Sequence, residues 1–90
     1  MKIYWDGKSK NIIGTRVKEL RKAMVPTCTQ LNLAEKLQLS GCDIDRITIV
    51  RIENGLRFVP DYEVKAIASV LGVTPNDLLC DNDDKIKKTL

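Results

Sequence analysis

Apolar residues recur at helical spacing along most of the chain. The first such segment starts at Ile12. Its apolar positions are Ile13, Val17, Leu20 and Met24. Steps of three or four residues place these side chains on one face of an α-helix. Because proline cannot continue a helix, the pattern predicts that this helix ends at Pro26.

Two short helices are predicted next. Thr29 is a good N-cap for the second helix, and Ser40-Gly41 breaks it. Asp45 is expected to cap the third helix, and Asn54-Gly55 to end it in a left-handed turn. The expected buried positions are Leu33, Ala34 and Leu37 in the second helix, and Ile49 and Ile52 in the third.

Two further helices complete the pattern. Asp61 is expected to cap a fourth helix that ends at Gly72, and Thr74-Pro75 supplies a cap and a first-turn proline for a short fifth. The apolar positions of these helices are Val64, Ile67, Ala68, Leu71, Leu78 and Leu79. Five helices with short connections and no strand-like alternation predict an all-α bundle.

The ends of the chain lack this helical pattern. We expect residues 1–11 to form an N-terminal arm, residues 12–80 the folded domain, and residues 81–90 a frayed tail, since DNDDKIKKTL holds few apolar residues. In the arm, Tyr4 and Trp5 either belong to a short extended segment or pack on the domain as a hydrophobic lid.

Composition limits the function classes. Ninety residues, 43% of them hydrophobic and 30% charged, suit one small globular domain. No apolar run approaches the roughly 20 residues of a membrane helix, and the basic start does not lead into a signal peptide. We therefore expect a cytoplasmic protein with no membrane partner.

The net charge of +3 is unevenly distributed. Residues 1–22 hold seven Lys or Arg against two acidic residues, a local charge of +5, whereas residues 61–90 have a local charge of −2. A basic flank suits a polyanionic partner, although it is equally typical of plain solvated surface.

Catalytic and metal-binding chemistry is not indicated. The chain has no His, and Cys28, Cys42 and Cys80 are widely spaced without a CxxC pair. We interpret the three cysteines as small, partly buried thiols. Without a paired ligand set, a phosphate-binding glycine loop or a nucleophile with its base, we expect no enzyme activity, no cofactor and no metal.

Several consecutive blocks of the sequence resemble the Cro and phage-repressor-like (XRE) helix-turn-helix family. These blocks are IGTRVKELRK at 13–22, TQxxLAEKL at 29–37, IxRIENG at 49–55, and DxxxxxIAxxLGVxxxxLL at 61–79. The resemblance spans residues 12–80. It implies a five-helix lambda-repressor-like DNA-binding domain whose third helix enters the major groove.

The helix-turn-helix reading assigns DNA contacts to named residues. The first turn of the third helix lies deepest in the groove, so Arg46, Ile47, Thr48 and Arg51 are the expected base-reading residues. Arg46 and Arg51 are suited to guanine, and Ile47 to a thymine methyl group. A solubilising surface role for the two arginines is the plainer alternative.

The resemblance also implies residues that contact the phosphate backbone or hold the third helix. The expected phosphate-binding residues are Thr29, Gln30, Asn54 (through its backbone amide) and Arg57. Arg21 lies at the family position that pairs with the glutamate at the end of the third helix, here Glu53. We therefore expect a structural ion pair between these two residues.

These features together predict a sequence-specific transcriptional regulator, most simply a repressor that binds double-stranded DNA as a homodimer. One helix-turn-helix covers few base pairs, so specificity ordinarily needs two half-sites. The interface would use the Tyr4-Trp5 arm, the last two helices or the DNA itself.

Two departures from the family pattern keep a second function open. The connection Gln38–Ile44 is about five residues longer than the tight family turn, so it either extends the second helix or bulges outward. The apolar Ile47 and Val50 stand where polar residues are common, and Leu31 and Leu56 where charged ones are. A protein-binding module, such as an antitoxin or a phage-encoded adaptor, is the alternative.

Overall fold

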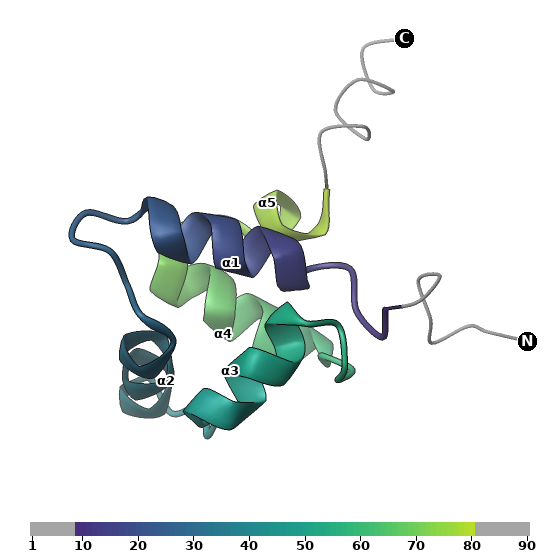
Figure 1. Cartoon of the computed structure of the whole chain (residues 1–90), viewed down its shortest axis with the longest axis horizontal. Coiled ribbons are helices and arrows are strands. Elements are labelled where there is room, and N and C mark those ends of the chain that lie inside the picture. The colour runs from purple at the N-terminus through teal and green to yellow at the C-terminus, as the bar shows by residue number, and fades with distance from the viewer. Residues whose placement is uncertain (1–8, 81–90) are drawn as a thin grey trace, which may run out of the picture.

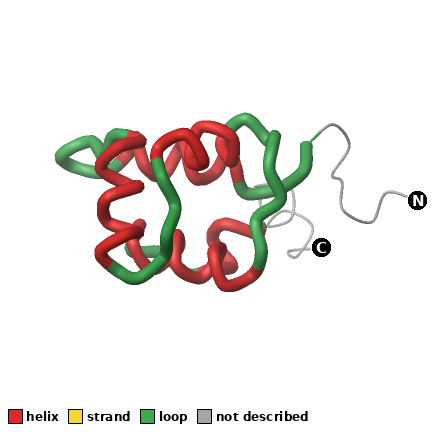
Figure 2. Tube along the Cα trace, turned by 90° about the horizontal axis from the view of Figure 1, so that it is seen from below, coloured by secondary structure: helices red, strands yellow, loops and turns green. Residues whose placement is uncertain are grey.

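The computed structural model describes residues 9–80, and within that range every regular element is a helix (Figures 1 and 2). The helices are α1 (Gly14–Ala23), α2 (Gln30–Leu39), α3 (Arg46–Glu53), α4 (Asp61–Leu71) and α5 (Pro75–Leu79). The predicted all-α class with five helices is confirmed for these residues. Our expectations for the Tyr4-Trp5 arm and for the tail at 81–90 concern residues outside the described range.

Polar side chains fix where three of the helices begin. The Thr29 hydroxyl accepts a hydrogen bond from the amide of Asn32, and Thr74 accepts one from Asp77; each pair forms a reciprocal capping box. Asp45 caps α3 by accepting from the Thr48 amide at 2.8 Å. These three caps were predicted from the sequence.

The predicted start of α4 was wrong by one residue. Pro60 occupies the N-cap position and makes no side-chain cap bond, and Asp61 is the first helical residue. A carboxylate in the first turn still interacts favourably with the positive end of the helix dipole. At the other end, Gly72 adopts the left-handed conformation (φ 75°) that stops the helix.

One hydrophobic core joins the helices. Figure 1 shows α2 and α3 side by side beneath α1 and α4. The helix contacts agree with this arrangement and place α5 against α4. The core comprises Ile13, Val17, Cys28, Leu33, Ala34, Leu37, Ile44, Ile49, Ile52, Val64, Ile67, Ala68, Leu71 and Leu78. No helix in residues 9–80 is long and apolar enough to span a membrane.

The first two residues of the connection Gln38–Ile44 belong to the end of α2, and residues 40–45 form a loop before α3. Gly41 turns the chain with a φ of 94°. Ile44 is fully buried, and its carbonyl accepts a bond from the Gln38 side chain at 3.2 Å. Burial is the main cause that raises the pKa of the partly buried Cys42 thiol, and the nearby Glu63 carboxylate raises it further. Both favour the neutral thiol. The loop is therefore fixed to the core just before α3.

Candidate nucleic-acid interface

Helix α3 buries one face and exposes the other. Ile49 and Ile52 point into the core, as predicted, while Arg46, Ile47 and Arg51 are exposed. Thr48 and Val50 are half-buried at the boundary between the two faces. Glu53 is the one acidic residue of α3, and it is buried. The outer face of the helix therefore combines two guanidinium groups with an apolar side chain and has no carboxylate of its own.

A buried ion pair holds the C-terminal end of α3 to α1. Arg21 Nε donates to Glu53 Oε2 at 2.8 Å, and a second guanidinium nitrogen donates to Oε1 at 3.1 Å. Arg21 also donates to the carbonyl of Cys28 at 3.0 Å, just before α2. The structure thus brings together the pair expected from the sequence, in the parallel two-bond geometry that suits guanidinium and carboxylate.

Gln30 joins this network. Its Nε2 donates to Glu53 Oε1 at 3.0 Å, so the side-chain amide that we expected to grip a phosphate is directed into the protein. The neighbouring Thr29 is exposed, with its hydroxyl and its amide both used in the capping box. In this geometry the Thr29 hydroxyl acts as the acceptor that caps α2, and Gln30 Nε2 uses one of its two hydrogens to bond Glu53.

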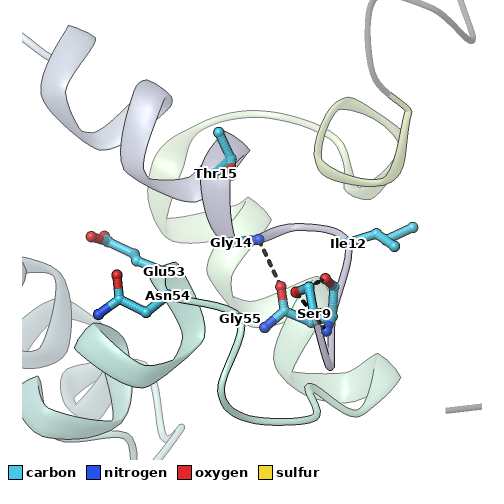
Figure 3. A pocket seen from close by; sticks show the side chains of 8 residues that line it. Ser9, Ile12, Gly14, Thr15, Glu53, Asn54 and Gly55 are labelled. Carbon is cyan, nitrogen blue, oxygen red and sulfur yellow. Dashed lines mark hydrogen bonds between the residues drawn. The ribbon is translucent and has the colours of Figure 1, made fainter. Parts of the chain in front are cut away.

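The structure corrects the expected role of the Asn54 backbone amide. Asn54 is the C-cap of α3, and its N–H donates to the carbonyl of Val50 at 3.1 Å. Closing the last turn of the helix occupies this amide, so it is not available to a phosphate. Asn54 is exposed, and it lines a pocket between the start of α1 and the turn after α3, together with Asn11 and Gly55 (Figure 3).

Arg57 has a partner that the sequence did not reveal. Its guanidinium donates twice to Glu63 of α4, at 2.6 and 3.2 Å, and once to the Phe58 carbonyl. These hydrogen bonds to the Glu63 carboxylate are the main cause that raises the pKa of Arg57. Because the Glu63 carboxylate already balances its charge, Arg57 attracts a phosphate less strongly than an unpaired arginine.

Asn11 is a structural residue that the sequence analysis missed. Its side-chain amide donates to the carbonyls of Ile52 at 3.0 Å and Arg57 at 2.9 Å. Its Oδ1 accepts from the amides of Ile13 and Gly14, and the bond to Gly14 appears as a dashed line in Figure 3. One side chain thus accepts from two amides at the start of α1 and joins this end of the helix to the end of α3 and to the loop that follows.

Two glycines allow this close approach. A Cβ on Gly14 would collide with the Ile52 carbonyl oxygen, and one on Gly55 with the Ser9 side chain. Gly55 also has a φ of 73°, which side chains rarely adopt. An Asn three residues before the first residue of a helix was the sequence signal for the local bond to Gly14. The long-range bonds of Asn11 could not be predicted from the sequence.

No protein-family model, curated protein or solved structure matches this chain. The chemistry and placement of the residues around α3 are therefore the guide to the function of this chain.

Proposed function

We propose that this chain is a sequence-specific DNA-binding regulator of transcription that inserts α3 into the major groove. The observation that supports this proposal is the exposed face of α3 with Arg46, Ile47 and Arg51, on a helix whose opposite face is fixed in the core. An α-helix fits the major groove, and arginine is the commonest side chain that donates to guanine O6 and N7.

The helix is held at both ends, which base recognition requires. The buried Ile44 and the Asp45 cap fix its start, and the Arg21–Glu53 pair and Asn11 fix its end. A rigidly held recognition element loses less conformational entropy on binding than a mobile one.

We propose further that the chain acts as a homodimer and as a repressor. One helix contacts only a few base pairs, so two copies on half-sites about one DNA turn apart would give useful specificity. In the simplest mechanism, such a dimer blocks access to the DNA that it covers.

A protein-binding module is the second candidate, and exposed apolar side chains favour it. Leu31, Leu56 and Ile47 are 52%, 60% and 67% exposed, respectively. Exposed aliphatic groups on adjoining elements suit a protein contact. A stoichiometric protein complex that is insensitive to DNA, together with no salt-dependent binding to duplex DNA, would favour this candidate.

The test is selection of bound duplexes from a random DNA pool at a stated salt concentration, using the full chain. A recurrent motif is expected, and its absence would contradict the proposal. Arg46→Ala should weaken binding to the selected site by about 1–3 kcal/mol and relax one base position per half-site. Lys18→Ala, which removes an exposed charge on α1, is the matched control and should leave the motif unchanged.

A further inference from the structure

A groove lies between α2 and α3 beside the exposed arginine. Leu31 from α2 and Ile47 from α3 line it, and both side chains are more than half exposed. Ala34, which is 2% exposed, and Gln38 also line the groove. Because alanine ends at Cβ, it takes up little of the space that the two larger aliphatic side chains border. The groove is therefore an apolar notch built by two helices, and we call it the Leu31–Ile47 notch.

Charged residues around the notch restrict what can occupy it. Glu35 and Asp45 line the same groove, and so does Arg46. Hydrogen bonds from Thr48 are the main cause that lowers the pKa of Asp45, so this carboxyl is ionised at neutral pH. Two carboxylates disfavour a phosphate group, whereas the apolar lining favours a small hydrocarbon group. A base edge fits these conditions better than the DNA backbone does.

The major groove displays one kind of apolar group on its base edges. This is the 5-methyl group of thymine, which 5-methylcytosine shares. Guanine, the base that suits arginine, offers two acceptors and no methyl group. Since Ile47 and Arg46 are consecutive in the first turn of α3, they are placed to contact neighbouring base pairs.

We propose that the Leu31–Ile47 notch receives the 5-methyl group of a pyrimidine next to a guanine that Arg46 contacts. This inference rests on the proposed DNA-binding function and adds a specificity determinant, Leu31, on the helix before the recognition helix. Discrimination then depends on the methyl group and not only on the hydrogen-bonding pattern of the bases.

The experiment uses a duplex selected by the full chain and replaces each thymine in turn by deoxyuridine, which removes only the methyl group. At one position in each half-site, replacing thymine by deoxyuridine should reduce affinity about fourfold. This corresponds to about 0.8 kcal/mol for one buried carbon group. Replacing that thymine by cytosine and by 5-methylcytosine separates the two sources of the methyl group. If the duplex with 5-methylcytosine binds more tightly than the duplex with cytosine, the notch accepts the methyl group of either base. If the two duplexes bind equally, the notch accepts only the methyl group of thymine.

Variants then assign the effect to the notch. Ile47→Ala and Leu31→Ala should each bring the thymine-to-deoxyuridine affinity ratio close to one. Leu39→Ala removes the same atoms from an 89% exposed position of α2 outside the groove, and should leave the ratio unchanged. Because all three positions are exposed, circular dichroism melts are expected to show a retained fold.

The outcomes separate this inference from the proposed function. Duplex binding with no dependence on any thymine methyl would overturn the inference and leave the DNA-binding proposal intact. Loss of the methyl effect in Ile47→Ala but not in Leu31→Ala would also overturn it, because the notch requires both helices. A chain that selects no duplex from the pool would contradict the proposed function itself.

Discussion

Removing Arg21 tests whether the buried ion pair holds α3 in place. Arg21→Met keeps an unbranched side chain of similar length while deleting the guanidinium. The Arg21 and Glu53 side chains are 7% and 2% exposed, so water cannot readily replace the lost partner. Glu53 would keep the bond from Gln30 Nε2 at 3.0 Å but lose both bonds from Arg21. We expect a large loss of stability because a carboxylate is left in the core without a counter-charge.

The size of the effect follows from the geometry. Stranding one partner of a buried pair costs about 3–5 kcal/mol, and a small domain has about 5–15 kcal/mol in total. Arg21→Met or Glu53→Met alone should therefore bring the domain close to unfolding. The double variant removes both charges. It leaves the Cys28 carbonyl without its bond from Arg21, at a cost of about 1–3 kcal/mol, and the half-buried Gln30 amide without its bond to Glu53.

Urea denaturation followed by far-ultraviolet circular dichroism measures these free energies of unfolding. The two single losses together exceed the loss in the double variant, so the double-mutant cycle should give a coupling energy of at least about 3 kcal/mol, with similar denaturant slopes for all four proteins. Glu19→Met is a control, because the Arg16–Glu19 pair is more exposed and is expected to contribute less than about 1 kcal/mol. Additive single effects, or single losses no larger than the control, would refute the reasoning.

Three further predictions concern the contacts at the ends of α1 and α3. Gly14→Ala should lower the free energy of unfolding by about 1–3 kcal/mol in urea titrations, since the new Cβ meets the Ile52 carbonyl; exposed Thr15→Ala should change it little. Asn11→Ala should cost about 1–3 kcal/mol and also weaken DNA binding, and an unchanged affinity would show that its bonds do not position α3. Asp45→Ala should lower the melting temperature at pH 7 but hardly at pH 2. The folded state lowers the pKa of Asp45 from its usual 3.8, so the ionised carboxylate stabilises the fold above that pH, and this contribution is lost as the pH falls through the pKa of the folded state. Asp45→Asn keeps an accepting oxygen and should depend less on pH, whereas equal effects of Asp45→Ala at both pH values would contradict this role.

The local features of the fold were readable from the sequence because they depend on near neighbours. A Thr or Asp at the start of a helix accepts a hydrogen bond from the amide three residues later, so a cap can be recognised from the local sequence. Thr29, Asp45 and Thr74 all cap their helices as predicted. The period of the apolar residues likewise identified the buried faces of α3 and α4. Pro60 took the cap position expected for Asp61 because the chain enters α4 in an extended conformation one residue earlier.

Contacts between distant residues were readable only where a known pattern supplied them. The resemblance pointed to Arg21 and Glu53, and the structure pairs them. No local rule connects Arg57 to Glu63 across the turn before α4, or the Asn11 side chain to the carbonyl of Ile52. Such partners depend on how the helices pack, which the apolar period does not specify.

The placement of these contacts bears on how α3 would recognise DNA. At its C-terminal end, Arg21 and Asn11 both act on the last turn, through the Glu53 carboxylate and the Ile52 carbonyl. Arg46, at the opposite end, is positioned by the short segment that includes the buried Ile44. We therefore expect a change at Asn11 to shift the whole helix and a change near Ile44 to alter mainly its first turn. The first kind should weaken binding to all sequences, and the second should change which bases are preferred.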